Sequence, residues 1–427
     1  MIALLNFVLR PAYLTMELSD TPQLRKPIRS IPGKIFDVLA GFGLATITLI
    51  LLGLLTWFAT LEQVDNGLYP TLNKYFATDW RHIFLLPELN GKIVPLPLPG
   101  GYWMCAILLI NLTLGGIIRI RKGWKHIGNL ISHFGIIFML IGAGVTYHFS
   151  ERGNMAVGEG ESSSAAEDYF EYVVEVAEIK DGKPAHIHII RGKDIDDLEG
   201  DKLRTFRLPE MPFDLELTSY MYNCVPVSAS ERAPDHGQFV ADGYFLAEKP
   251  KLAKAEPAEQ YTAGSYARIV TRDGKKEAPF ILAGASFHPF SYRLGDRVFT
   301  VDMRKRLWPM PFTLKLDHFT ADFHPGTSMA SKFISKVTRI ENGGEAKVTI
   351  QMNAPMRYEG LTFFQASYGP PGALPGQKMY SVFEVVRNPA DQWPKYSLWI
   401  VAFGMFVTFI IKLAFFLGAG PRKFRNV

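Results

Sequence analysis

The side chain with the most distinctive chemical setting is a histidine inside an apolar segment. His133 lies in the run Ser132-His133-Phe134-Gly135, within a stretch long enough to cross a membrane. An ionisable side chain is costly in that setting and is therefore a functional candidate by default. Neutral imidazole avoids burying a charge, and it is a standard axial ligand of haem iron. An imidazole that only hydrogen-bonds between two helices would explain the spacing too, so both interpretations stay open at this point.

The surroundings of His133 suit a flat apolar ligand with anionic edges, such as haem. Counted from the basic turn near residue 126, His133 lies about 10 Å along the helix axis at about 1.5 Å per residue, which places it in the inner leaflet. Arg119 or Lys125 at the cytoplasmic edge is available to the propionates. Three glycines would allow a neighbouring helix or a macrocycle to approach closely: Gly135, Gly142 and Gly144.

The other histidines and the two cysteines are expected to have interfacial, surface or structural roles. His126 and His148 fall at the two ends of the segment, and two further pairs lie in polar surroundings, His186 with His188 and His318 with His324. Cys105 lies in an apolar stretch and cannot readily pair with Cys224, so we expect no disulfide. The sequence has no CxxC, CxxCH, zinc spacing, GxSxG, HExxH or phosphate loop, which argues against those redox, metal and hydrolytic sites.

Four stretches of the 427-residue chain are apolar enough to position such a site in a bilayer. A spanning helix needs about 20 mainly apolar residues. The segments that qualify are 35–59, 102–118, 127–147 and 397–417. Asp37 and Lys412 lie near the ends of these segments, where a polar head group can reach the interface. Residues 1–16 are apolar but lack the features of a signal peptide, so an interfacial segment is expected.

The basic residues determine the expected orientation. The net charge is +5 at pH 7, and three basic clusters flank the apolar segments, which favours a topology signal over nucleic-acid binding. With four spans, all three clusters fall on one side, and the positive-inside rule makes that side cytoplasmic. The clusters are Arg25, Lys26, Arg29 and Lys34; Arg119, Arg121, Lys122 and Lys125; and Arg422, Lys423 and Arg425.

We therefore expect a membrane α-helical protein with four transmembrane helices and a large, mainly-β extracytoplasmic domain. Residues 1–34 form a cytoplasmic or interfacial N-terminus, and 35–148 form a three-helix membrane module with an external loop at 60–101. Residues 149–395 form the extracytoplasmic domain. Residues 396–427 form the fourth transmembrane helix and a basic cytoplasmic tail.

The extracytoplasmic domain shows the alternation of strands. Strands are predicted at 170–179, 186–190, 212–220, 280–282, 297–302, 312–318 and 347–352. The run PEMPFDLELTSY at 209–220 is echoed by WPMPFTLKLDHF at 308–319, as in a duplicated β-sandwich. The stretch 225–275 is expected to be a long variable connection. Three aromatic residues could form a docking surface but are more often core residues: Phe363, Phe364 and Tyr368.

Several runs carry a family resemblance. The sequence HFGIIFMLIGAGVTYHFSERGNMAVGEGES at 133–162 resembles the third span and its continuation in the ResB family, also called CcsB. Members are subunits of the system II cytochrome c biogenesis complex. The runs TLEQVDNGLY at 60–69 and PLPGGY at 97–102 are similar to the family as well. So are MNAPMRYEGLTFFQASYGPPG at 352–372 and NPADQWPKY at 388–396.

The resemblance implies a role in carrying haem b outward across the bacterial cytoplasmic membrane and presenting it to the CxxCH motifs of apocytochrome c. It implies that His133 is one axial ligand of a membrane haem site and so binds the haem iron. The opposing ligand and a tryptophan-rich segment belong to the family's partner, ResC or CcsA, and the seven tryptophans here are scattered. We therefore expect a non-catalytic subunit of a holocytochrome c synthase complex.

Two other functional classes fit the same topology. One is a permease-like transporter subunit, although such proteins usually carry the outer domain after the first span. The other is a membrane-anchored docking or sensor protein without haem, in which His133 only packs between helices.

Overall fold

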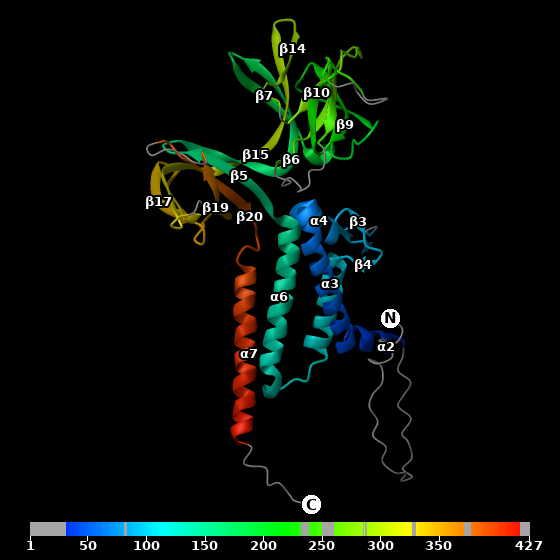
Figure 1. The fold of residues 1–427 in the computed structure, drawn as a ribbon, viewed down its shortest axis with the longest axis vertical. Coiled ribbons are helices and arrows are strands. Elements are labelled where there is room, and N and C mark those ends of the chain that lie inside the picture. Colours follow the sequence, from blue (N-terminus) through cyan, green and yellow to red (C-terminus); the bar gives the residue numbers. More distant parts are fainter. Residues whose placement is uncertain are drawn as a thin grey trace, which may run out of the picture.

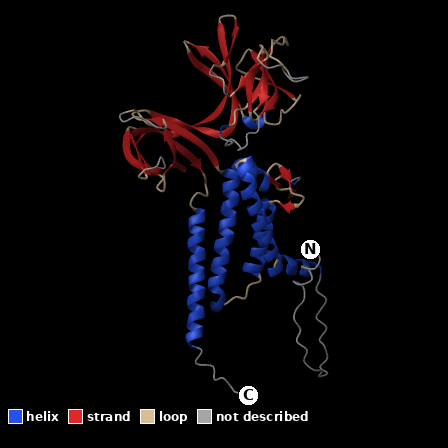
Figure 2. Ribbon diagram, viewed as in Figure 1, coloured by secondary structure: helices blue, strands red, loops and turns tan. Residues whose placement is uncertain are grey.

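The computed structural model describes residues 31–80, 83–231, 239–249, 260–284, 286, 288–326, 330–370 and 377–418. Helices gather at one end of the molecule and most strands at the other (Figures 1 and 2). Four helices in the described residues are long and apolar enough to cross a membrane. They are α3 (Phe42–Asn66), α5 continued by the π-helical η2 (Gly101–Asn111 and Leu112–Ile118), η3 continued by α6 (Trp124–His126 and Ile127–Phe149), and α7 (Trp393–Gly418). The predicted class, four membrane helices and a large mainly-β region, is confirmed.

The first predicted span begins too early in the chain. Residues 31–39 form a separate helix, α2 (Ile31–Leu39), which runs sideways from the base of α3 (Figure 1). The helix breaks at Gly41, whose backbone is extended (φ −81°, ψ 143°). The Nδ2 of Asn111 on α5 donates to the carbonyls of Leu39 (2.6 Å) and Gly41 (2.9 Å). These bonds replace helical ones, because a break in lipid is tolerated only where its backbone groups find new partners.

The external loop after α3 is organised around one buried carboxylate. Glu62 is 1% exposed and accepts hydrogen bonds from Lys74 Nζ (2.6 Å), Tyr75 Oη (2.8 Å) and the Glu88 amide (2.8 Å). These partners belong to α4 (Leu68–Tyr75) and to a small set of strands: β1 (Phe84–Leu85), β2 (Glu88–Leu89), β3 (Lys92–Ile93) and β4 (Leu98–Pro99). The run TLEQVDNGLY thus has a structural explanation, since a buried charge must be paired.

Two long strands run through the whole β-rich region and join its two halves. β6 (Ser162–Lys180) pairs antiparallel with β15 (Arg297–Phe323), from Ile179 opposite Val298 to Ser162 opposite Lys315. Among the described residues this pair lies inside a ten-stranded sheet of order β17-β16-β15-β6-β5-β20-β19-β18, with β14 paired to β15 and β7 to β6. The other strands are β5 (Glu151–Gly158), β7 (Lys183–Ile190), β14 (Phe290–Leu294), β16 (Ala330–Glu341), β17 (Gly344–Gln351), β18 (Met356–Tyr358), β19 (Leu361–Gly369) and β20 (Tyr380–Arg387).

A second sheet covers one half of the long strands. In the described part of the chain it has four strands in the order β13-β12-β9-β8. Their bounds are β8 (Leu203–Phe206), β9 (Phe213–Met221), β12 (Gly264–Thr271) and β13 (Phe280–Ala283). The short helix η4 (Gly192–Asp194) follows β7. All seven segments predicted as strands lie in strands, but 297–302 and 312–318 are parts of the single strand β15.

The two halves have separate hydrophobic cores, and each contains one copy of the repeated sequence run. Phe213, Leu215 and Leu217 are fully buried in the core between the second sheet and the far half of the long strands. The matching residues of the second copy are buried in the other core: Phe312, Leu314 and Leu316. Each copy therefore buries its alternate residues in the way a strand with one core-facing side does. Whether the halves arose by duplication stays a prediction.

The expectation of one long connection over 225–275 is wrong. This stretch contributes most of the hairpin of β10 (Cys224–Ser228) with β11 (Tyr244–Glu248), and also β12, the strand next to β9. Its alanine, glutamate and lysine content hid these strands, of which β12 pairs with β9 and β13 outside the stretch. Residues 232–238 and 250–259 of the stretch lie outside the described part.

A buried arginine lies where the two halves of the β-rich region meet the membrane helices. Arg306 on β15 has a side chain that is only 14% exposed. Its guanidinium lies 3.0 Å from a Glu151 oxygen, 2.8 Å from Asp168 and 2.5 Å from Glu171. Glu151 is the first residue of β5, just after α6, so the cluster connects the central strands β6 and β15 to the point where the β-rich region joins α6.

The Arg306→Met variant should destabilise the β-rich region. Removal of Arg306 takes the ion-pair partner from Asp168 and leaves Glu171 with Arg191 and Glu151 with Arg387. The loss of a partner from a partly buried charge costs about 3 kcal/mol. Near-UV circular dichroism of the full chain during thermal unfolding in detergent should show a lower midpoint. The exposed pair of Arg204 with Asp197 supplies the control, since Arg204→Met should leave the midpoint almost unchanged. Equal midpoints for Arg306→Met and the wild type would show that the cluster adds nothing to stability.

The same cluster should make stability depend on pH. Burial acts to raise the pKa of Glu171, but the hydrogen bond from Arg191, the charges of Arg306 and Arg191, and the Gly192 amide outweigh it, so the pKa is lowered. A lowered folded-state pKa adds stability above the unfolded value of about 4.3, and this contribution is lost as the pH falls through the folded value. The unfolding midpoint of Glu171→Gln should therefore fall less steeply than that of the wild type between pH 5 and 3. Parallel pH profiles would contradict this assignment.

Candidate functional site

His133 is held between two helical segments by one hydrogen bond. The side chain lies on α6, is half-buried, and has its Nδ1 atom 3.0 Å from the carbonyl oxygen of Gly116 in η2. A carbonyl can only accept, so Nδ1 carries the proton in this contact. The neutral ring therefore keeps its lone pair on Nε2. This is the arrangement of a metal-binding histidine, in which the second ring nitrogen donates to a carbonyl or carboxylate and fixes the tautomer.

The contact depends on the absence of a side chain at Gly116. A Cβ atom there would lie 2.8 Å from His133 Nδ1, and one at the adjacent Gly115 would lie 2.7 Å from the Ala40 oxygen. The two glycines thus let η2 touch the α2–α3 break with one side and His133 with the other. The segment is π-helical over Leu112–Ile118, a conformation that occurs mostly as short insertions, often at functional sites.

The opposite side of α6 is packed tightly against α7. Gly128 and Gly404 meet at backbone distance, since a Cβ on Gly128 would lie 2.5 Å from the Gly404 oxygen. The Oγ of Ser397 donates to the Gly135 carbonyl (2.7 Å). Small residues and interhelical hydrogen bonds of this kind are what stabilises helix pairs in lipid. Gly135 and Gly142 therefore admit a helix, with Val401 and Trp393 as their nearest neighbours, whereas Gly144 has nothing near it.

The arrangement offers a single nitrogen ligand in an apolar setting. No group of three or more His, Cys, Asp or Glu side chains in the described residues could hold a metal ion. One histidine with a fixed tautomer in an apolar helix suits a metal that already has its equatorial ligands, as haem iron has. The structure thus offers one imidazole nitrogen at this position.

The basic residues near this site differ in their surroundings. Arg119, predicted to serve a propionate, has its Nη1 atom 3.6 Å from a carboxylate oxygen of Asp37 on α2. Lys125, the other candidate, lies over the ring of Phe415 on α7, with Nζ 4.6 Å from the centroid. Arg121 and Lys122 instead line a groove of about 260 Å³ at the start of α6.

The remaining histidines lie away from His133. His148 is exposed at the outer end of α6, where its Nε2 atom is 3.3 Å from the Tyr102 hydroxyl. His318 Nδ1 is 2.8 Å from a carboxylate oxygen of Glu159, and His186 is opposite Glu178 in the β6–β7 pairing. His126 lies in η3, just before the start of α6.

The aromatic residues proposed for docking belong largely to the core. Phe363 is fully buried, and Tyr368 stacks on Phe319 with centroids 5.2 Å apart. The neighbouring Gln365 is buried and accepts a hydrogen bond from Ser335 Oγ (2.6 Å). Its Nε2 donates to Ser381 Oγ (2.9 Å), so the FFQASYG run ties three strands together inside the second core.

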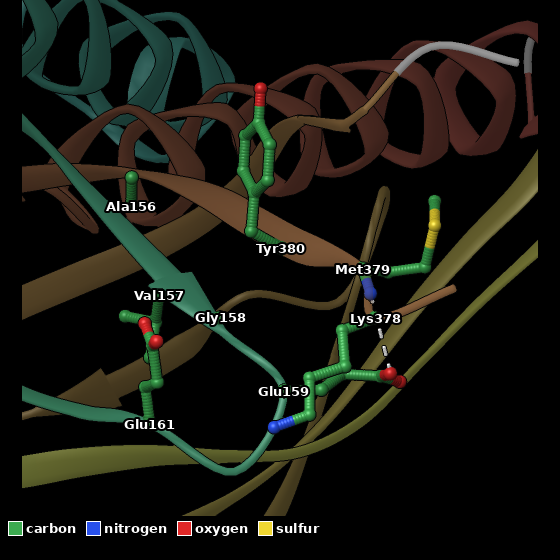
Figure 3. A pocket seen from close by; sticks show the side chains of 8 residues that line it. All are labelled: Ala156, Val157, Gly158, Glu159, Glu161, Lys378, Met379 and Tyr380. Atoms are coloured by element: carbon green, nitrogen blue, oxygen red, sulfur yellow. Dashed lines mark hydrogen bonds between the residues drawn. The ribbon is translucent and has the colours of Figure 1, made fainter. Parts of the chain in front are cut away.

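A cavity in the β-rich region was missed from the sequence. It has a volume of about 560 Å³ and lies where β5 ends and β20 begins, as Figure 3 shows, with Glu159, Glu161, Lys378 and Tyr380 around it. Burial acts to raise the pKa of Glu159, but hydrogen bonds from the Phe319 and Met379 amides and from His318 outweigh it and lower the pKa. The only sequence signal is a pair of glutamates separated by a glycine at 159–161.

Comparison with known proteins finds a family match for one segment of the chain. Residues 280–375, from β13 to beyond the end of β19, match the ResB-like family. Protein NrfI of Wolinella succinogenes is 24% identical over 269 residues, which cover 62% of this chain and 26% of that protein. The cytochrome c biogenesis protein CcsB of Microcystis aeruginosa is 28% identical over 110 residues, which cover 25% of this chain and 23% of that protein.

The similarity to the ResB-like family is shown for this segment. The matched segment contains the second copy of the repeated run and the pair of Ser335 with Gln365, whereas His133 lies outside it. The chain spans only about a quarter of the length of either curated relative.

The Gly116→Ala variant should displace the imidazole of His133. The added methyl group meets Nδ1 at 2.8 Å, so the ring must turn and lose its hydrogen bond to the carbonyl. In ¹⁵N-histidine-labelled protein, the wild type should show His133 protonated at Nδ1 alone, and the variant should lose that preference. Gly144→Ala on α6, with nothing within 4 Å of the new methyl group, is the matched control. An unchanged His133 signal in Gly116→Ala would show that Gly116 does not fix the tautomer.

Proposed function

We propose that this protein acts in cytochrome c biogenesis, as a subunit that binds haem b in the membrane and helps present it to apocytochrome c outside the cytoplasm. The observation that carries the proposal is the state of His133, an imidazole inside a membrane helix with Nδ1 bonded to Gly116 and Nε2 left for a metal. The name of the relative CcsB, a cytochrome c biogenesis protein, supports the same general role.

The position of the β-rich region supports an outward-facing role. The region starts from the end of α6 opposite the basic turn at residues 119–125 (Figure 1). The positive-inside rule then favours a cytoplasmic position for the turn and an extracytoplasmic one for the β-rich region. We infer residence in a bacterial cytoplasmic membrane, with His133 nearer the cytoplasmic face.

A membrane partner follows from the ligand count. A bis-histidine haem needs a second imidazole, and His133 is the one intramembrane histidine of the described spans that lies away from their ends. We propose that a ResC/CcsA-type subunit supplies it. Such a partner has room to dock on α7, because only 6% of the most apolar stretch of this helix is buried within the chain.

The segments that join the β-rich region to α6 and α7 would couple the docking of partners outside the membrane to the site at His133. Thr146 on α6 and Asn388 before α7 exchange hydrogen bonds of 3.3 and 3.1 Å. Just beyond, Arg387 Nη1 is 3.0 Å from Glu151, and β5 pairs with β20. The helix that carries His133 is therefore continuous with a firmly held strand of the outer region.

The His133→Ala variant should lose bound haem. We expect the wild-type chain, purified from cells supplied with a haem precursor, to show a Soret band, and the variant to lose or shift it. Added imidazole should restore the band, since it replaces the missing ligand. His148→Ala, at the other end of the same helix, should keep wild-type haem content.

Full haem retention by His133→Ala would exclude His133 as the ligand. No haem in the wild type, with normal folding, would favour a haem-free docking or sensor protein. Failure to co-purify with any tryptophan-rich membrane partner would weaken the assembly model and leave a permease-like role as the alternative.

A further inference from the structure

A groove with cationic and apolar walls lies at the cytoplasmic end of the helix that carries His133. It has a volume of about 260 Å³ and is formed where η2 turns into η3 and α6. Its lining includes Arg121, Lys122, Trp124, His126, Ile127 and Leu130, and none of the lining residues is acidic.

The two cations of the groove have free hydrogen-bonding capacity. Arg121 is exposed and makes no hydrogen bond or ion pair with any residue in the described part of the chain. Lys122 Nζ donates one hydrogen bond to the Ile117 carbonyl (2.8 Å), which leaves further donors on the ammonium group. By contrast, Arg119 is engaged with Asp37, and Lys125 lies against Phe415. An anion that arrives at this turn therefore meets Arg121 and Lys122.

The apolar wall of the groove leads toward His133. Leu130 and His133 are three residues apart on α6 and are therefore neighbours on one face of the helix. His126 precedes His133 by seven residues, about 10 Å along the axis at about 1.5 Å per residue. A flat molecule with its acidic edge at the turn and its apolar body along Leu130 would reach Nε2 of His133. The exposed Trp124 marks the membrane interface at this level.

We propose that this groove is the carboxylate-binding end of the haem site, where Arg121 and Lys122 bind the two propionates while His133 binds the iron. This proposal rests on the proposed function and adds the residues that orient the ligand. Ion pairs of guanidinium and ammonium groups with carboxylates are the stronger class of hydrogen bond, and long basic side chains reach the interface from such positions. The propionates then face the cytoplasm, which fixes the ligand's direction of insertion.

The test compares haem with its dimethyl ester, in which both propionates are uncharged. The full chain, reconstituted in nanodiscs of zwitterionic lipid, is titrated with each compound and followed by the Soret band. The wild type should bind haem at least about 10-fold more tightly than the ester, because two charge-assisted contacts are lost with the ester. The double variant Arg121→Gln/Lys122→Gln should bind both compounds with the affinity that the wild type has for the ester.

The matched control is Lys125→Gln, which removes a nearby positive charge that lies outside the groove and should keep the preference for haem. If Lys125→Gln loses the preference to the same extent as the double variant, general charge rather than the groove is responsible, and the proposal fails. A double variant that still prefers haem to the ester overturns it directly.

The other source of the same anionic chemistry is a phospholipid head group. Titration in nanodiscs with added phosphatidylglycerol separates the two. If the double variant loses phosphatidylglycerol binding but keeps its preference for haem, the groove is a lipid site and the proposal is wrong.

The proposed function and the propionate site can be tested separately, because different variants report on them. If His133→Ala keeps full haem affinity while the double variant loses the preference for haem, the axial ligand is misassigned but the propionate site stands. If the wild type binds neither compound, both proposals are overturned.

Discussion

The close contact between α6 and α7 is the constraint on which the other features depend. At Gly128 and Gly404 the two backbones meet without intervening side chains, and Ser397 and Thr408 add hydrogen bonds across the interface. In lipid, apolar surface gives little drive to associate, so this packing and these polar contacts must hold the pair together. The pair in turn sets the spacing of β5 and β20, the first and last strands of the β-rich region. It also fixes which face of α6 remains for His133.

Three polar side chains inside or beside the membrane helices have defined hydrogen-bond partners. Asn111 satisfies two carbonyls at the break between α2 and α3, Glu62 gathers the donors of the external loop, and His133 bonds to Gly116. The first two use their main hydrogen-bonding capacity within the chain. His133 differs, because its Nε2 atom has no hydrogen-bond partner among the described residues, while the side chain is only half-buried. The imidazole is thus oriented by the fold and still has capacity to bind, which is the physical basis of the proposed role.

Hydropathy and charge predicted the four spans and the β-rich region well, because both signals depend on short stretches of sequence. The break at Gly41 could not be predicted from the same signals, since its stabilising amide comes from Asn111, 70 residues away. The strands over 224–271 were missed for a similar reason, as β12 is defined by its pairing with β9 and β13. At the site, His133 could be identified as a candidate from the sequence because it lies inside an apolar span. The role of Gly116, and the different surroundings of Arg119 and Arg121, depend on contacts between distant segments and could be seen only in the structure.

The adjacency of β5 and β20 has a consequence for how the fold tolerates change. The β-rich region begins with β5, which follows α6, and ends with β20, which precedes α7, and these two strands pair with each other. Topologically, the region is therefore an insertion into the connection between α6 and α7. The separation of its two attachment points is set by the ladder from Glu151–Arg387 to Gly158–Tyr380, whatever the size of the rest. Insertions and deletions further out, such as near the β10–β11 hairpin, can therefore change the outer surface without moving the membrane helices. The architecture separates a part that can diverge with its outer partners from a part whose geometry must stay constant.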